Sequence, residues 1–163
     1  MDILFLERNG VDLYETLFSS ETSRNALRFY RPQAVTGGVV VSTASLGSAL
    51  SLVSELRWYI RRYMQEVLFE LGPGIYCTHR LAQEAYYDRS ASLATPWGFR
   101  RLYAIHDGIL TREPLPPGMT IADCRDRYHS GDLLLEVWCA GDDSAGEIDT
   151  PDEGDEEPDT APE

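Results

Sequence analysis

The stretch THRLAQEAYYDRSASLATPWGFRRLYAIHDGIL, residues 78–110, contains the clearest helix boundaries in the chain. Thr95 is a good N-cap because its hydroxyl can accept a hydrogen bond from the first turn, and Pro96 suits the first helical position. Gly108 suits the position after a helix, where glycine takes a left-handed backbone without a Cβ penalty. We therefore expect a central helix that begins at Pro96 and ends at Gly108. Its apolar stripe follows the 3.6-residue period at Phe99, Leu102, Tyr103, His106, Ile109 and Leu110.

A β-hairpin is the alternative for the same residues. Asp107-Gly108 is a typical two-residue turn, which would join a strand over residues 102–106 to one over residues 109–112. We favour the helix because the cap, the proline and the apolar stripe agree, whereas the hairpin rests on one dipeptide.

Helical patterns also precede this stretch. Residues 45–71 form the longest periodic segment, and either Gly47 or a break near Leu56 is expected to divide a helix too long for a compact domain. Thr78 is expected to cap a further helix. The exception is Gly37-Gly38 followed by three valines, which predicts a short strand or an extended linker.

The N-terminal residues are ambiguous. Asn9-Gly10 between apolar runs indicates a hairpin, yet Val11, Tyr14 and Phe18 fit one face of a helix. Ser20 before Glu21 then predicts the start of a helix that the next proline ends.

The residues after the central helix give weaker signals. Residues 114–118 contain three prolines and predict a stiff connector, and residues 120–128 predict a short helix. The next apolar run, residues 132–139, is too short to be assigned to a helix or a strand.

Charge divides the chain into a nearly neutral body and an acidic tail. Residues 141–163 contain 11 acidic residues and no basic one, which leaves 16 acidic residues against 14 arginines in residues 1–140, a net charge of −2. Such a tail cannot bury enough apolar surface to fold. We therefore expect a helical domain over residues 1–140 and a disordered tail over residues 141–163. A nearly neutral body also disfavours nucleic-acid binding.

The reactive side chains form no recognisable catalytic or metal-binding pattern. The chain has three cysteines, which fit no zinc spacing and indicate a reducing compartment. Cys77 and His79 are close in sequence, but their spacing matches no nucleophile or metal motif. No apolar run suits a membrane span. We expect a non-enzymatic intracellular protein without a metal, a cofactor or a transmembrane segment.

Short motifs along the chain resemble a known family. Trp97-Gly98 followed by Arg100 resembles the first homology motif of Bcl-2-type apoptosis regulators, in which Trp-Gly-Arg opens the buried helix. Gln83-Glu84, Leu93 and Thr95-Pro96 are similar to a run in the adenovirus small T antigens, the nineteen-kilodalton products of early region one B. Further matches follow in that family's order at Leu6-Glu7, Leu17, Ser19-Ser20, Thr22-Ser23, Arg28-Phe29, Ser130-Gly131 and Leu133-Leu134.

The resemblance implies an all-α, Bcl-2-like helical bundle around the central helix. The implied function is that of an early viral protein which inhibits host apoptosis by binding pro-apoptotic proteins of the Bax/Bak type in a hydrophobic groove. It would act inside the host cell, in the cytoplasm or at host membranes or the nuclear envelope through its partners. Arg100 or Arg101 would pair with an acidic residue of the ligand. The implied partner-binding residues are Leu50, Val53, Leu81, Ala85, Trp97, Gly98, Arg100, Arg101, Leu102 and Tyr103.

Two other classes remain open. The first is a non-enzymatic adaptor whose acidic tail binds a basic host partner. The second is an enzyme with an α+β fold, which would be favoured if residues 39–41, 102–106 and 133–137 form one sheet.

Overall fold

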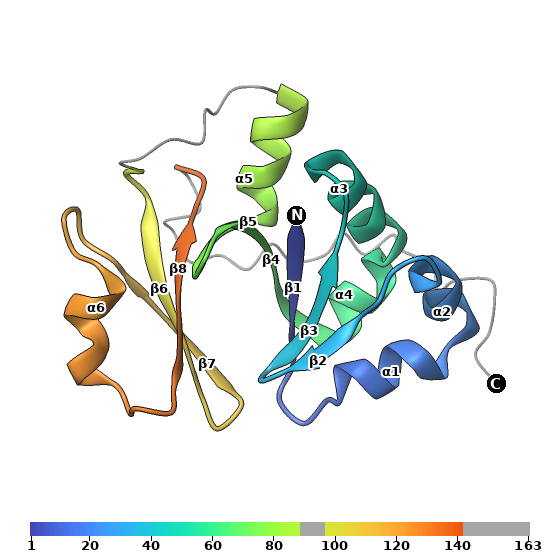
Figure 1. The fold of residues 1–163 in the computed structure, drawn as a ribbon, viewed down its shortest axis with the longest axis horizontal. Coiled ribbons are helices and arrows are strands. Elements are labelled where there is room, and N and C mark those ends of the chain that lie inside the picture. Colours follow the sequence, from blue (N-terminus) through green and yellow to red (C-terminus); the bar gives the residue numbers. More distant parts are fainter. Residues whose placement is uncertain (89–96, 142–163) are drawn as a thin grey trace. The chain divides into compact units, whose positions relative to one another are not determined.

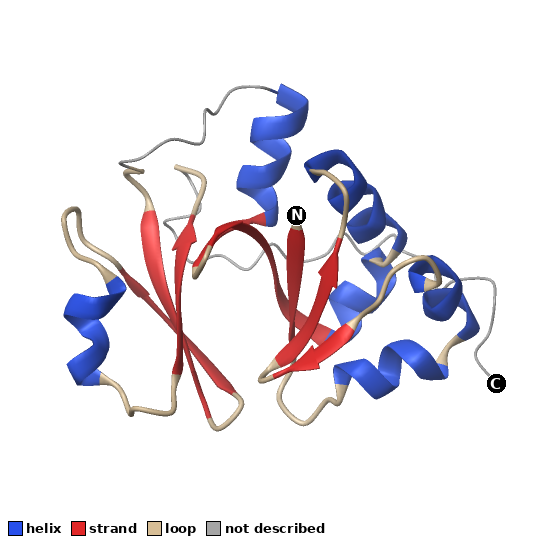
Figure 2. Ribbon diagram, in the orientation of Figure 1, coloured by secondary structure: helices blue, strands red, loops and turns tan. Residues whose placement is uncertain are grey.

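The computed structural model describes residues 1–88 and 97–141, and in these ranges the chain is α+β (Figure 1, Figure 2). The predicted all-α bundle is therefore wrong, and the α+β alternative is confirmed. The described strands are β1 (Asp2–Glu7), β2 (Gln33–Val35), β3 (Gly38–Ser42), β4 (Met64–Gly72), β5 (Ile75–Thr78), β6 (Arg100–His106), β7 (Ile109–Pro114) and β8 (Leu133–Trp138). Their hydrogen-bonded order is β2-β3-β1-β4-β5-β8-β6-β7.

The helices are short. They are α1 (Leu13–Ser19), α2 (Glu21–Leu27), α3 (Leu46–Glu55), α4 (Arg57–Tyr63), α5 (His79–Gln83) and α6 (Ile121–Cys124). A π-helical turn, η1 (Glu84–Asp88), continues α5, and a 3₁₀ turn, η2 (Arg125–Arg127), continues α6.

The contacts group into two compact units. Unit 1 contains Met1–Val67, and unit 2 contains Leu68–Gly146, of which residues 68–88 and 97–141 are described. Strand β4 begins in unit 1 and ends in unit 2. Apart from Gly141, the tail predicted to be disordered lies outside the described residues.

Unit 1 has the element order β-α-α-β-β-α-α-β and the strand order β2-β3-β1-β4. A βαββαβ chain with this strand order has the ferredoxin-like, or split βαβ, topology. In unit 1, α1 and α2 together occupy the place of the first helix of this pattern, and α3 and α4 together occupy the place of the second. Its helices lie on one side of β1, β2 and β3 (Figure 2). The other face of these strands is therefore not covered by the helices of unit 1.

The core of unit 1 follows from the register of two central strands. Strands β1 and β3 are antiparallel, with Ile3 opposite Val41 and Phe5 opposite Val39, and these four side chains are completely buried. The prediction of a strand at the three valines is confirmed, because β-branched side chains pack well in a sheet. A two-residue turn containing Gly37, whose φ is +83°, joins β2 to β3.

The long predicted helix over residues 45–71 is correct only in its first two thirds. Ser45 caps α3 by accepting a hydrogen bond from the Ser48 amide at 3.1 Å, and the expected break falls at Leu56. From Met64 onward the chain is instead strand β4. Buried and exposed residues do not alternate along β4, and Val67, Leu68 and Phe69 are consecutive buried residues. The sequence of β4 therefore lacks the two-residue apolar–polar alternation that identifies a half-exposed strand.

The central helix is also wrong, and the rejected hairpin is confirmed. Arg100–His106 form β6, which pairs antiparallel with β7 through the turn Asp107-Gly108. The two turn residues have φ of +48° and +79°, as a type I′ turn requires. Both faces of β6 are buried from Leu102 to Ile105, so apolar residues occur without two-residue alternation. Their spacing therefore also fits the apolar face of a helix. The expected cap, Thr95-Pro96, lies outside the described residues.

The short predicted helices of unit 2 are confirmed at their first turns. Thr78 caps α5, its hydroxyl accepting from the Leu81 amide at 3.2 Å. Thr120 caps α6 in a reciprocal arrangement with Asp123. The unassigned run near residue 135 is strand β8, which is antiparallel to β6 and parallel to β5. Helix α6 covers a cluster of buried residues formed by Leu102, Ala104, Leu115, Cys124 and Leu134.

Gly38→Ala should destabilise the protein by about 1–3 kcal/mol, because an added Cβ would lie 1.9 Å from the Phe5 carbonyl oxygen and force β1 and β3 apart. Urea denaturation measures the change. Gly98→Ala is the matched control, since no atom lies within 4 Å of its added Cβ, and it should change stability by less than about 0.5 kcal/mol. Equal unfolding midpoints for the two variants would contradict the β1–β3 register.

Candidate functional site

The ten residues predicted to bind a partner are divided between the two units. Leu50 and Val53 lie in α3 of unit 1, and both are buried. The other eight lie in unit 2: Leu81 in α5, Ala85 in η1, Trp97 and Gly98 before β6, and Arg100, Arg101, Leu102 and Tyr103 in β6. The expected groove wall, the central helix predicted to begin at Pro96, is instead strand β6 from Arg100 onward.

Most of these side chains have structural contacts in unit 2. Trp97 stacks parallel on Trp138 at 5.7 Å between ring centroids and donates its indole N–H to the Cys139 carbonyl. Leu102 is completely buried in the cluster under α6. Tyr103 is 2 % exposed on the other face of β6, where the Arg112 guanidinium lies over its ring. These residues serve the fold of unit 2.

Arg100, proposed to pair with a ligand's acidic residue, already has an acidic partner. Its Nη1 lies 2.7 Å from Glu136 Oε1, and the two side chains are only 13 % and 12 % exposed. Its Nη2 donates to the carbonyls of Pro116 and Met119, both at 3.0 Å. Arg100 thus ties β8 to the connector before α6, and its guanidinium is not presented to a partner.

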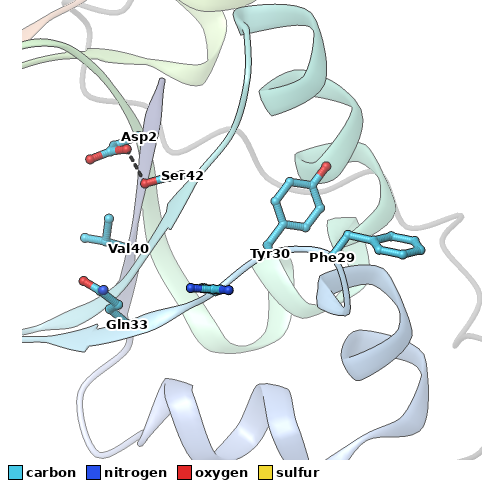
Figure 3. A pocket seen from close by; sticks show the side chains of 7 residues that line it. Asp2, Phe29, Tyr30, Gln33, Val40 and Ser42 are labelled. Atoms are coloured by element: carbon cyan, nitrogen blue, oxygen red, sulfur yellow. Dashed lines mark hydrogen bonds between the residues drawn. The ribbon is translucent and has the colours of Figure 1, made fainter.

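A different site lies in unit 1. A pocket of about 430 Å³ opens between the end of α2 and the strands β1, β2 and β3 (Figure 3). In Figure 3, Asp2 and Ser42 lie at one end of the lining, and Phe29 and Tyr30 at the other. The pocket is lined by Asp2, Phe29, Tyr30, Arg31, Gln33, Val40 and Ser42.

The strand register explains why these residues share one face. Asp2 is opposite Ser42 in the β1–β3 pair, and Gln33 is opposite Val40 in the β2–β3 pair. Because side chains alternate across a strand, all four point to the face opposite the buried Ile3 and Val41. The segment between α2 and β2 adds the remaining three residues. The pocket therefore lies on the face that the helices of unit 1 do not cover.

The polar groups of the pocket are only partly used. The Ser42 hydroxyl donates to Asp2 Oδ1 at 2.6 Å. By contrast, no hydrogen bond or ion pair within residues 1–88 and 97–141 engages the Arg31 guanidinium, the Gln33 amide group or the Tyr30 hydroxyl. No local motif marks this site, because the helix predicted to continue to the next proline ends instead at Leu27.

The second group of ionisable residues lies in unit 2, where β6 ends and β8 begins. His106 Nδ1 is 2.5 Å from Asp132 Oδ1, and Asp132 Oδ2 accepts the His129 amide at 3.1 Å. The rings of His106 and His129 stack at 4.6 Å between centroids. An ionised carboxylate accepts hydrogen bonds, so Nδ1 of His106 carries a proton.

This geometry shifts both pKa values. The hydrogen bond to Asp132 raises the pKa of His106 above its ordinary 6.5. Partial desolvation lowers this pKa, but the negative charges of Asp107 and Asp132 raise it further. Burial acts to raise the pKa of Asp132, but the bonds from His106 and the His129 amide outweigh it, so this pKa lies below its ordinary 3.8. The pair is therefore charged in mildly acidic solution.

The cysteines do not form an activated site. Cys77, Cys124 and Cys139 are all buried free thiols. Burial, with a contribution from Cys139, raises the pKa of Cys77 to about 12, so it is protonated near neutral pH and is a poor nucleophile. The described part of the chain contains no group of three or more His, Cys, Asp or Glu side chains suited to a metal ion. No helix in that part has the length and apolar character of a membrane span.

These observations define an α+β protein whose ferredoxin-like first unit carries a small polar pocket. Residues 1–90 match the family model described as a family of unknown function (DUF5804), and the chain belongs to this family. The match covers Met1–Val67 of unit 1 and ends after η1, so it includes the pocket and excludes the His106–Asp132 pair. No curated protein and no solved structure matches the chain.

Asp132→Asn should lower the pKa of His106 toward 6.5, because a neutral amide no longer stabilises the imidazolium. The pair should stabilise the wild type most between pH 3.8 and 6.5, with its contribution lost as the pH rises through the pKa of His106 or falls through that of Asp132. NMR titration of the ring protons measures the pKa. Asp107→Asn, at an 86 % exposed side chain, should have a smaller effect. An unchanged titration of His106 in Asp132→Asn would refute this account.

Arg100→Met should lower the free energy of unfolding by about 3 kcal/mol, because it leaves the largely buried Glu136 carboxylate without its cation. Adding Glu136→Gln should recover part of the loss by removing that charge. Arg127→Met is the control: its partner Glu113 lies 2.8 Å away, but the side chains are 57 % and 34 % exposed, so a loss below about 1 kcal/mol is expected. Denaturant unfolding compares the variants, and equal losses would contradict a buried role for the Arg100–Glu136 pair.

Proposed function

We propose that unit 1 is a binding module for a small organic anion and that the pocket beside β2 and β3 is its binding site. The observation that carries the proposal is a guanidinium, from Arg31, and an amide, from Gln33, that line one pocket and have no partners among the described residues. Polar groups that converge on a concave surface are the usual means by which a protein orients a small ligand.

Arg31 sets the expected charge of the ligand. A guanidinium is ionised at every physiological pH and presents a planar fork of donors that matches a carboxylate or a phosphate. No acidic side chain in the described ranges forms an ion pair with Arg31. An anionic group on the ligand would supply the missing counter-charge and form charge-assisted hydrogen bonds.

The remaining lining favours an organic body over an inorganic ion. Val40 and Tyr30 are half-buried and offer apolar surface inside the pocket. The volume of about 430 Å³ lies within the roughly 300–1,000 Å³ of typical small-molecule sites. A ligand with both an apolar portion and an anionic group would use the two kinds of lining together.

The geometry does not support a nucleic-acid platform on the same sheet. Single-stranded RNA binds comparable four-stranded sheets by stacking bases on aromatic side chains of the central strands. On the pocket face, β1 and β3 instead present Leu4, Leu6 and Val40, and the two leucines are only 3 % and 1 % exposed. This face therefore presents no aromatic side chain of β1 or β3 on which a base could stack.

Inhibition of apoptosis stays a prediction that rests on the resemblance alone. It requires a groove between helices, whereas Arg100, Leu102 and Tyr103 lie in a strand and have structural contacts. Binding of a basic partner by the tail concerns residues outside the described ranges. The absence of catalysis and the location inside a host cell also stay predictions.

Arg31→Met in the full chain should weaken binding of a small anion about tenfold or more, because a charge-assisted bidentate contact is lost. Thermal shift assays with carboxylates, amino acids, sugar phosphates and nucleotides identify the binding class, and calorimetry gives its affinity. A ligand at about 100 times its Kd should add about 2.7 kcal/mol of stability.

Arg24→Met is the matched control, since Arg24 is an exposed arginine of α2 that does not line the pocket. It should bind the ligand as the wild type does. The proposal fails if no anion of these classes stabilises the wild type, or if Arg31→Met binds as tightly as Arg24→Met.

A further inference from the structure

We infer that the ligand is a ribonucleoside monophosphate, held with its sugar against Asp2 and Ser42, its phosphate against Arg31 and its base against Tyr30. The inference rests on the proposed function and assigns one part of the ligand to each part of the pocket. Its basis is the separation of Asp2 and Ser42 from Tyr30 along the lining (Figure 3), to which Arg31 also belongs.

The Asp2–Ser42 pair suits a ribose diol. Ser42 occupies only Oδ1 of the carboxylate, at 2.6 Å, and no described residue donates to Oδ2. Neighbouring hydroxyls can donate to a carboxylate, as in dinucleotide sites where an acidic residue binds ribose. The β1–β3 register holds Asp2 and Ser42 opposite each other, so the site is preorganised. A 2′-deoxyribose would lose one of these hydrogen bonds.

Arg31 suits the phosphate. Its guanidinium can form two parallel hydrogen bonds to phosphate oxygens, and it has no competing partner in the described part of the chain. Asp2 carries the opposite charge, so a phosphate would be repelled from that end of the pocket. The charges of the lining thus favour one orientation of the nucleotide.

The aromatic end suits a base. Phe29 is 81 % exposed, but the Arg28 guanidinium lies 4.4 Å from its ring centroid and covers one face. Tyr30 is half-buried and has no such cover among the described residues, so its ring is the better stacking surface. Stacking on an aromatic ring accepts any base, because every base has a π-face.

The size of the pocket separates this ligand from smaller anions. An amino acid or inorganic phosphate would satisfy one end of the lining and leave the rest hydrated. A mononucleotide would contact all three parts of a pocket of about 430 Å³. Its binding should therefore depend on both ends of the lining, whereas that of a smaller anion should depend on one.

Calorimetry with the full chain tests the assignment, using AMP, GMP, CMP and UMP as probes beside adenosine, 2′-deoxy-AMP, inorganic phosphate, glutamate and glycine. We expect the four ribonucleotides to bind with affinities within about tenfold of one another, since stacking is sequence-tolerant. Adenosine and 2′-deoxy-AMP should each bind about tenfold or more weakly than AMP, which is the loss of one charge-assisted interaction.

Two variants separate the ends of the pocket. Asp2→Asn should weaken AMP about tenfold and 2′-deoxy-AMP less, because the amide still accepts from Ser42 but has lost its charge. Arg31→Met should weaken AMP and leave adenosine unchanged. Arg24→Met and His106→Asn lie outside the pocket and serve as controls, and circular dichroism checks that every variant is folded.

The outcomes distinguish this inference from the proposed function. Binding of glutamate or glycine in an Arg31-dependent manner, without binding of nucleotides, would overturn the nucleotide assignment and leave the organic-anion module standing. Equal affinity for inorganic phosphate and AMP would overturn it as well, because the sugar and base would then contribute nothing. Failure of every anion to bind would remove both.

Discussion

The antiparallel pairing of β1 with β3 is the interaction on which unit 1 depends. It places Ile3 opposite Val41 and Phe5 opposite Val39, and these side chains form the completely buried centre of the unit. Because side chains alternate across a strand, the same register places Asp2 opposite Ser42 on the other face. A shift of one residue would exchange the two faces. The core and the pocket are therefore set by a single register, and the tight approach of Gly38 to the Phe5 carbonyl holds it.

In unit 2, charged side chains pair with one another inside the unit. Along one face of β6 and β8, the Arg100–Glu136 ion pair, the apolar cluster under α6 and the His106–Asp132 pair follow one another. The two charged pairs, Arg100–Glu136 and His106–Asp132, are formed within the unit, so they contribute to its stability. In unit 1 the side chains of Tyr30, Arg31 and Gln33 lack such partners among the described residues, which is why the binding site is proposed there. The family match covers residues 1–90 and therefore includes the pocket.

The sequence resolved the parts of the fold that depend on local chemistry. The cap at Thr78, the helical segments expected from Ser45 and from Thr120, the valine strand and the break at Leu56 all follow from neighbouring residues, and all are present. The candidate site could not be found in this way, because the hydrogen-bond partner of Asp2, Ser42, lies 40 residues away in the sequence. Arg31 is notable only because its guanidinium has no partner among the described residues, which no sequence pattern indicates. The ten residues taken from the resemblance are divided between two units. Six of them, from Trp97 to Tyr103, belong to the predicted central helix, which is strand β6 from Arg100 onward.

The amino-acid sequence by itself determined the capped helix starts, the acidic tail's composition and the turn-forming dipeptides, because each depends on a few adjacent residues. It even contained the correct turn at Asp107-Gly108. Only the tertiary structure decided that β4 and β6 are strands. Both run through the sheet with consecutive buried residues, so they lack the alternation that marks a half-exposed strand and their apolar spacing also fits a helix. Pairing with distant strands supplies the hydrogen bonds and the burial that select one conformation, and no local pattern records those partners.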